Sequence, residues 1–96
     1  MRMVILDEAE IDLQEAFAYY DSLESELGDK FLWEFQHSLR RIQDFPESYA
    51  KVYKNIRLCP IRRFPYGIFY AVGQTTVFIE AIIFLKRNPR YWKKRF

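Results

Sequence analysis

The chain has 96 residues, of which 50% are hydrophobic and 19% aromatic, and its formal net charge is +2. This length suits one compact core, so we expect a single domain spanning residues 1–96, in which aromatic side chains compensate for the small size. One cysteine cannot form an internal disulfide, and neither a signal peptide nor an apolar run of membrane-spanning length is visible. We therefore expect a cytoplasmic protein that does not enter membranes and that folds without a metal or cofactor.

The charges are distributed unevenly along the chain. Residues 1–47 contain four Lys/Arg and twelve Asp/Glu, a formal charge of −8, whereas residues 48–96 contain eleven and one, a formal charge of +10. With only Glu80 among them, the cations of the second half cannot all be neutralised by their sequence neighbours. This division favours a basic surface that binds an acidic partner or nucleic acid. The alternative is two oppositely charged layers that attract each other within one domain.

The first half begins with a short strand and continues as a helix. The apolar run within residues 1–6 is too short for a helix and predicts a strand. Asp7, followed by Glu10, predicts the capped start of a helix that runs to about Glu26 and stops at Leu27-Gly28. The apolar positions of this helix, at helical spacing, are Leu13, Ala16, Phe17, Tyr20 and Leu23.

A second helix follows directly. Asp29 is placed to cap it, and Pro46 ends it. Its apolar stripe recurs every three or four residues, at Phe31, Phe35, Leu39 and Ile42. Because the connection between the two helices is short, they must form an antiparallel hairpin. The two apolar stripes of the hairpin then need a common surface to cover.

The second half changes to the two-residue period of β-strands. We expect strands at residues 56–59, 64–72 and 77–84, a turn at 73–75, and irregular chain around residues 61–64, since Pro60 and Pro65 lack a ladder N–H. The last strand is apolar on both faces, which predicts a central strand. One of its faces is expected to carry Val77, Ile79, Ala81 and Ile83. The expected fold class is α+β: an N-terminal strand, then an antiparallel helical hairpin packed on a mainly antiparallel sheet (β-α-α-β-β-β). A basic C-terminal tail, residues 86–96, follows the last strand.

Most catalytic templates are excluded by the residues present. His37, the one histidine, lies opposite the apolar stripe of its helix, which favours an exposed residue over a catalytic or metal-binding one. Cys59 lies in a predicted strand and is typical of an inert thiol. The sequence contains no glycine-rich phosphate loop, metal-ligand cluster or serine nucleophile elbow. What remains is cationic and aromatic, as in surfaces that bind phosphates, carboxylates or bases.

The candidate binding residues come from the strands and the tail. Those expected to contact a binding partner are Arg57, Arg62, Arg63, Arg87, Arg90, Trp92 and Lys93. For Trp92, packing of the tail onto the sheet is an equally good interpretation, because tryptophan is more often a packing residue.

An ordered set of residues spans almost the whole chain. It comprises Asp12-Leu13, Ala16 and Tyr19-Tyr20, then Leu27-Gly28 and Phe31, Ile42 and Phe45-Pro46, Arg57, Phe64-Pro65-Tyr66-x-Ile68-x-Tyr70, Ile79-x-Ala81, and Arg87-x-Pro89-x-x-Trp92-x-x-Arg95. Together with the order of elements, this set resembles the RelE/ParE toxin superfamily. The resemblance implies the toxin of a bacterial type II toxin-antitoxin pair, with an antitoxin segment that wraps the toxin and masks its active surface.

The superfamily divides by target, and the resemblance implies different chemistry for each branch. RelE-like toxins cleave ribosome-bound messenger RNA with clustered Lys, Arg and Tyr, whereas ParE-like toxins inhibit DNA gyrase without such a cluster. Positions matching that cluster hold Leu58, Pro60 and Gly67 here, which leaves Arg87 as the one clear match. Many relatives have a histidine where this chain has Phe84. We therefore expect a ParE-like toxin, not an enzyme, that binds gyrase through its basic face and tail and that a cognate antitoxin neutralises.

Two alternatives stay open. The first is a RelE-like, ribosome-dependent messenger RNA endoribonuclease, whose catalytic residues would be Arg57, Arg63, Arg87 and Tyr91. The second is an inactive family member that retains antitoxin binding. A homodimer and a toxin-antitoxin hetero-oligomer are both compatible with the resemblance.

Overall fold

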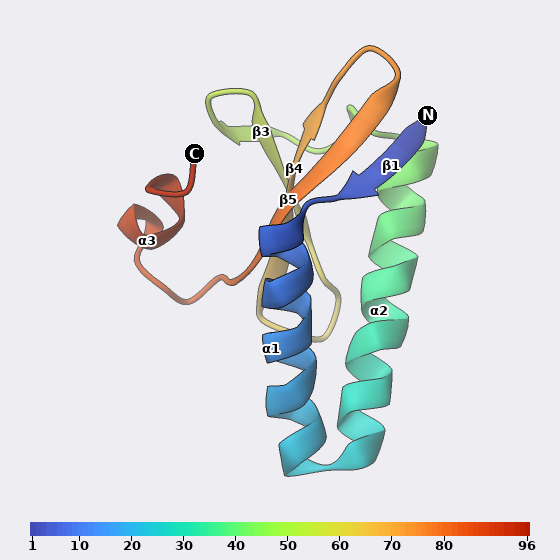
Figure 1. The fold of residues 1–96 in the computed structure, drawn as a ribbon, viewed down its shortest axis with the longest axis vertical. Helices are drawn as coiled ribbons and strands as arrows, with labels where there is room; N and C mark the ends of the chain where they lie inside the picture. Colours follow the sequence, from blue (N-terminus) through green and yellow to red (C-terminus); the bar gives the residue numbers. More distant parts are fainter.

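A computed structural model describes residues 1–96 and contains two long helices, five strands and a short C-terminal helix (Figure 1). In chain order the elements are β1 (Arg2–Ile5), α1 (Asp7–Leu23), α2 (Ser25–Asp44), β2 (Lys51–Tyr53), β3 (Ile56–Pro60), β4 (Tyr66–Val72), β5 (Thr76–Phe84) and α3 (Pro89–Lys93). The predicted α+β order is confirmed, and the structure adds β2 and α3 to it. With three residues, β2 is too short to show a period. None of the helices has the length and apolar composition needed to cross a membrane.

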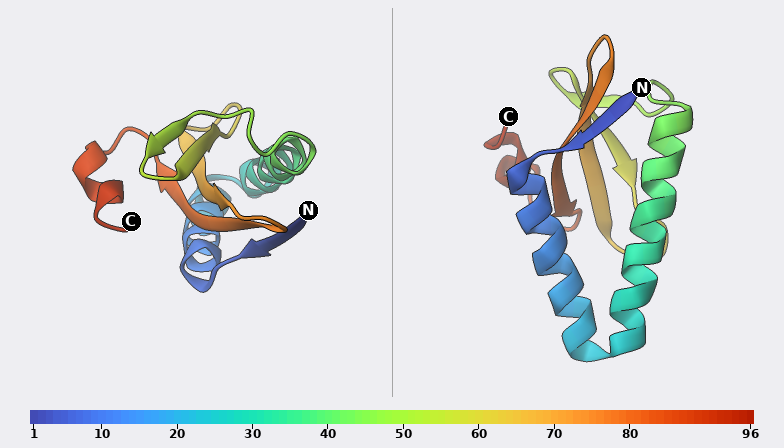
Figure 2. Two further views of the ribbon diagram at one scale, coloured as in Figure 1. Left: turned by 90° about the horizontal axis from the view of Figure 1, so that it is seen from above. Right: turned by 45° about the vertical axis from the view of Figure 1, so that its right-hand side comes forward.

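The strands form one sheet in the order β1-β5-β4-β3-β2. β1 pairs with β5 in parallel, and the other neighbours are antiparallel. β5 therefore lies inside the sheet, as predicted. The hairpin of α1 and α2 covers one face of this sheet, whereas α3 lies at the far side of the sheet from α2 (Figure 2). The tail is therefore separated from most of the hairpin.

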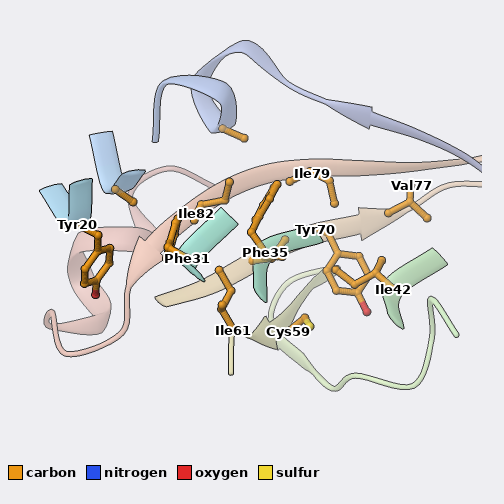
Figure 3. Close-up of a cluster of buried hydrophobic side chains, with 13 residues drawn as sticks. Tyr20, Phe31, Phe35, Ile42, Cys59, Ile61, Tyr70, Val77, Ile79 and Ile82 are labelled. Carbon is orange, nitrogen blue, oxygen red and sulfur yellow. The ribbon is translucent and has the colours of Figure 1, made fainter. Parts of the chain in front are cut away.

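The larger core lies between the hairpin and the sheet (Figure 3). The buried stripe of α2 is the predicted one, because Phe31, Phe35 and Ile42 are at most 3% exposed. Ile68 and Tyr70 of β4 belong to the same core. Burial of these large side chains supplies most of the driving force for folding in so small a chain.

The turn of the hairpin differs from the predicted one. α1 ends at Leu23, three residues before the predicted end, and Glu24 alone separates α1 from α2. Gly28, predicted as the helix stop, lies inside α2, where an added Cβ would come within 3.0 Å of Phe17 Cε1 and Asp21 Cβ. The missing side chain therefore allows the two helices to approach closely, and it does not serve as a left-handed C-cap.

The predicted side-chain caps are absent. The N-cap of α1 is Leu6, with no side-chain hydrogen bond, and Asp7 is the first helical residue. Asp29, predicted to cap the second helix, lies within α2. Acidic residues in the first turn of α1 still favour the helix electrostatically, because this end of the helix carries a partial positive charge. Leu23, predicted to be in the apolar stripe, is 60% exposed because α1 ends there.

A β-bulge in β5 changes which side chains face the hairpin. Ile79 and Ala81 have partners in β4, but Glu80, between them, has none. Val77 and Ile79 therefore belong to the core under the hairpin, whereas Ala81 and Ile83 belong to a second cluster. The predicted uninterrupted alternation of these four residues is wrong, because one extra residue reverses the two-residue period.

Candidate functional site

In the C-terminal tail, α3 begins with a side-chain cap and packs on the sheet through Trp92. At its start, Asn88 accepts a hydrogen bond from the Arg90 N–H at 2.9 Å, and Pro89 occupies the first turn. Further along, Trp92 is 9% exposed and packs on Phe69 of β4, with ring centroids 5.0 Å apart. Trp92 therefore packs the tail onto the sheet, as the alternative interpretation of this residue proposed. The exposed cations of the tail are Lys86, Arg87, Arg90, Lys93 and Lys94.

Arg87 lies within a group of aromatic side chains. Its guanidinium carbon is 4.2 Å from the centroid of the Tyr91 ring. Arg87 also lines a surface pocket of about 210 Å³ with Tyr19, Tyr66 and Phe84. The pocket rings come from three elements: Tyr19 from α1, Tyr66 from β4 and Phe84 from β5. The rings of Tyr19 and Tyr91 are about half exposed. We call these five residues the Arg87 patch.

The Arg87 patch can bind an anion, and none of its five residues is a carboxylate, although Glu15 lines the adjoining pocket. Burial raises the pKa of the Tyr66 hydroxyl, and Tyr19 and Glu15 add to this effect, whereas Arg87 opposes it. The Tyr66 phenol is therefore neutral at physiological pH and forms hydrogen bonds without acting as a base. A guanidinium between flat rings suits a carboxylate or phosphate that carries an adjoining planar or apolar group.

Three rings from the body of the protein, those of Tyr19, Tyr66 and Phe84, surround Arg87 and were not predicted as site residues from the sequence. Tyr19 is next to the buried Tyr20 in the sequence. Because neighbouring residues of a helix point about 100° apart, two consecutive tyrosines cannot both enter the core. This was the available signal that Tyr19 is exposed. Tyr66 and Phe84 offered no comparable signal, because their position depends on the pairing of β4 with β5.

Arg95 joins the tail to α1 and β5. Its Nη1 lies 2.9 Å from both carboxylate oxygens of Asp12, and its Nη2 donates to the Glu80 carbonyl at 3.3 Å. Oδ2 of Asp12 also accepts the Ile82 N–H at 3.0 Å. Glu8 lies 3.5 Å from Arg95 Nη2, but its side chain is 79% exposed. Both Asp12 and Arg95 belong to the ordered set that carries the family resemblance, but their contact was not predicted from the sequence.

Arg57 holds the loop between α2 and β2. Its Nη1 donates to the carbonyl oxygens of Glu47 at 3.1 Å and Tyr49 at 2.6 Å. Arg57 is paired with Tyr70 of β4, whereas Tyr66 of the Arg87 patch lies four residues away on the same strand. At about 3.3 Å per residue this separates them by roughly 13 Å. The structure therefore places Arg57 outside the Arg87 patch.

Arg62 and Arg63 lie in the connection between β3 and β4, and both are exposed. Nε of Arg63 lies 3.4 Å from the carboxylate of Glu34 on α2. The side chain of Glu34 is 7% exposed and that of Arg63 is 79% exposed. The guanidinium thus compensates a nearly buried carboxylate, and it is directed to α2 and not to the tail.

The sequence model of the ParE toxin family, described as "ParE toxin of type II toxin-antitoxin system, parDE", matches residues 4–89 of this chain. The chain belongs to this ParE toxin family. Among solved structures, it is similar to a chain described as "Chromosomal ParDE TA system from P. aeruginosa", with a TM-score of 0.79 and 18% sequence identity. That likeness covers 90% of this chain and 97% of the other, and it shows a shared fold. A comparison with curated proteins found no match.

In this ParE-family chain, the residues named for an RNA-cleaving site are not all gathered. Arg87 and Tyr91 are in contact, but Arg57 binds loop carbonyls and Arg63 pairs with an acid of α2. The position of Gly67 holds no cation, and a side chain there would require the ends of the Leu58 and Leu85 side chains to move.

Two further residues of this ParE-family chain lie where the sequence analysis expected them. His37 is exposed and stacks on Trp33, with ring centroids 3.6 Å apart. Cys59 is fully buried, and this burial raises the pKa of its thiol. A thiol in this environment stays protonated and is a poor nucleophile. The structure contains no group of three His, Cys, Asp or Glu side chains arranged to hold a metal ion.

Proposed function

We propose that this chain is the growth-inhibiting toxin of its pair and that it acts by binding DNA gyrase through the Arg87 patch and the exposed cations of the tail. Membership of the ParE toxin family supports the toxin role. The choice of a protein target over RNA cleavage rests on the chemistry of the patch. In this proposal the chain is not an enzyme.

The observation that carries this choice is the separation of Arg87 from the other cations that were expected beside it. Cleavage by a 2′-hydroxyl needs one group to accept its proton, one to protonate the leaving oxygen and cations to stabilise the charged phosphorane. Arg87 supplies only a cation, because a guanidinium stays charged at any ordinary pH. Tyr66 keeps its proton, and Arg57 is engaged elsewhere. A protein-binding surface has no need of proton transfer, and Arg and Tyr are frequent interface anchors.

We infer further that a cognate antitoxin neutralises the toxin by laying an acidic segment over the Arg87 patch and the tail. The exposed cations of the tail give this surface a strong positive charge. The half-exposed rings of Tyr19 and Tyr91 provide apolar area for the same segment to bury. One surface would then serve both partners, so that the bound antitoxin excludes the target.

Two assays on the purified protein test the target. We expect wild type to inhibit DNA supercoiling by gyrase without cleaving messenger RNA on programmed ribosomes. Because truncation of an interface anchor typically costs 2 kcal/mol or more, Arg87→Ala should raise the half-inhibitory concentration by about thirtyfold. Arg40→Ala is the matched control, since Arg40 is an exposed arginine on α2.

Other outcomes would select one of the alternatives. Codon-dependent cleavage that Arg87→Ala abolishes, with supercoiling untouched, would make the chain a ribosome-dependent endoribonuclease. A folded wild-type protein that binds its antitoxin but affects neither assay nor bacterial growth would be an inactive family member.

A further inference from the structure

We propose that Asp12 and Arg95 are positioning residues, which lock the C-terminal tail in the orientation that presents Arg87 to the target. This inference rests on the proposed function, because it assigns the tail to target binding. It concerns two residues that do not belong to the Arg87 patch. Arg95 lies beyond residue 89, where the match to the ParE toxin family ends.

The ion pair occupies a part of the β5 edge that no strand covers. Pairing of β1 with β5 ends at Ile79, after which the chain turns into α1. Beyond that point the carboxylate of Asp12 accepts the Ile82 N–H, and the guanidinium of Arg95 donates to the Glu80 carbonyl. Together the two side chains satisfy backbone groups that a neighbouring strand would otherwise bind.

The geometry of the pair makes it more than an ordinary surface contact. The side chains of Arg95 and Asp12 are 20% and 15% exposed, respectively. Both distances from Nη1 to the carboxylate oxygens are 2.9 Å. Charge-assisted bonds that are short and shielded from water are stronger than exposed ion pairs, and they fix direction as well as distance.

Besides this pair, the tail is held by aromatic packing and by one exposed bond, in which Lys54 Nζ donates to the Phe96 carbonyl at 2.6 Å. α3 has only five residues, and a helix this short is not stable without tertiary contacts. Trp92 and Phe96 both pack on Phe69, and these apolar contacts restrict the distance of the tail from the sheet more than its rotation. Arg95, three residues after Trp92, supplies a second point of attachment on α1 and β5.

The pair and the Arg87 patch are physically continuous. A pocket of about 100 Å³ is lined by Asp12 and Arg95 together with Tyr66, Arg87 and Tyr91 of the patch. A shift of the tail at Arg95 would therefore move the ring of Tyr91 away from Arg87. Loss of the pair should reduce target binding even though neither Asp12 nor Arg95 needs to touch the target.

The test compares Arg95→Gln and Asp12→Ala with Glu8→Ala. Glu8 is the matched control, because it is an acid on the same helix within reach of the same guanidinium, but it is exposed and has no bond to β5. Arg95→Lys keeps the positive charge but has a single nitrogen, so it cannot bind the Asp12 carboxylate and the Glu80 carbonyl through two separate nitrogens as arginine does. All variants are studied below their unfolding temperature, where circular dichroism shows equal folded fractions.

Nuclear magnetic resonance reads the tail independently of any target. In Arg95→Gln and Asp12→Ala we expect faster backbone motion at residues 89–96. In Asp12→Ala, exchange of the Ile82 amide should accelerate at least about tenfold, since its acceptor is gone. Glu8→Ala should match wild type, and Arg95→Lys should fall between. A tail that stays as rigid as in wild type in Arg95→Gln and Asp12→Ala would overturn the proposal.

Gyrase inhibition then shows whether a rigid tail matters. We expect the half-inhibitory concentration to rise about tenfold in Arg95→Gln and Asp12→Ala, with partial recovery in Arg95→Lys and no change in Glu8→Ala. A mobile tail with unchanged inhibition would overturn the positioning role. If wild type itself does not inhibit gyrase, the proposed function fails. The tail measurements would still decide whether the lock exists, and growth inhibition in cells would replace supercoiling as the second readout.

Discussion

Tyr70 is a polar side chain that the core accommodates without exposing it. Its ring is fully buried between the hairpin and β4, and its hydroxyl donates to the Pro46 carbonyl at 2.7 Å. This bond ties the centre of the sheet to the chain just after α2. Burial, with a smaller effect of the Cys59 thiol, raises the pKa of Tyr70 to about 12. The phenol therefore stays protonated in the folded protein at pH values where an unfolded chain would release the proton.

The raised pKa predicts a loss of stability in alkali. The stabilising contribution of Tyr70 is fully present below its ordinary pKa of 10.0 and is lost as the pH rises towards 12. The free energy of unfolding of wild type should therefore fall more steeply over this range than that of Tyr70→Phe. At neutral pH, Tyr70→Phe should be less stable by about 1 kcal/mol, because the Pro46 carbonyl loses its donor. Urea denaturation across this pH range checks both effects.

The exposed Tyr91 supplies the control for this experiment. Tyr91→Phe removes a hydroxyl from a ring that is 46% exposed, so at neutral pH its free energy of unfolding should stay within about 0.5 kcal/mol of wild type. Parallel curves for Tyr70→Phe and wild type would mean that the buried hydroxyl ionises as readily as a solvated one.

The hairpin shows how closely two helices approach when a glycine lies between them. Gly28 of α2 faces Phe17 and Asp21 of α1, and an added Cβ would lie 3.1 Å from the Cα of Asp21. With Glu24 as the only connecting residue, the helices cannot separate here without disturbing their turn. Intrinsic helix propensity alone would favour alanine by about 1 kcal/mol.

We predict that Gly28→Ala destabilises the protein in spite of this propensity, by about 1 kcal/mol or more, because backbone atoms of α1 must move. Thermal or urea unfolding measures the change. Ala18→Gly, at an exposed position of α1, provides the propensity effect alone and should cost about 1 kcal/mol. If Gly28→Ala were more stable than wild type, the contact between the helices would be looser than the structure indicates.

Much of the element order could be predicted because repeated features determine it. The stripe of α2 rests on several residues in one period, so a single ambiguous residue does not change the outcome. The hairpin turn could not be placed, because a glycine suits both a helix end and a close helix contact, and Gly28 serves the second purpose. The bulge at Glu80 was hidden because β5 is apolar on both faces, a pattern that fits either register.

The candidate site was predicted in its residue types more than in its contacts. The sequence indicated that cations and aromatic rings of the tail form a surface, and Arg87 with Tyr91 lies there. The sequence could not indicate that the side chain of Arg57 binds the loop between α2 and β2. Its acceptors there are backbone carbonyls, which every residue has. The partnership of Asp12 with Arg95 spans 83 residues and depends on how α1 and the tail converge on β5.

At the scale of the whole molecule, the basic and acidic halves neutralise each other very little. The ion pairs between them involve two cations of the second half, Arg63 and Arg95. The exposed cations of the tail form no ion pair with an acidic side chain. Attraction between an acidic and a basic layer of the domain is therefore a minor effect. The charge distribution favours a basic surface that binds a partner.

We predict that binding of the acidic antitoxin segment weakens with salt. Screening at high ionic strength should raise the dissociation constant by at least about tenfold relative to low salt, because exposed charges on both sides contribute. Titration calorimetry at two salt concentrations measures this change, and Arg87→Ala should reduce the salt dependence. A complex insensitive to salt would indicate that the antitoxin binds the helical hairpin instead.

The parallel pairing of β1 with β5 affects the order in which the protein folds during synthesis. Arg2 of β1 pairs with Thr76 of β5, so β1 cannot pair until the 74 residues that follow Arg2 have been synthesised. Contacts between such distant parts of a chain form late, because a long loop must close before they give any stabilisation. The ion pair of Asp12 with Arg95 forms later still, because Arg95 is synthesised 83 residues after Asp12. If the proposed function holds, the target-binding surface is therefore among the last parts to assemble, so an antitoxin that is already folded can bind it as it forms.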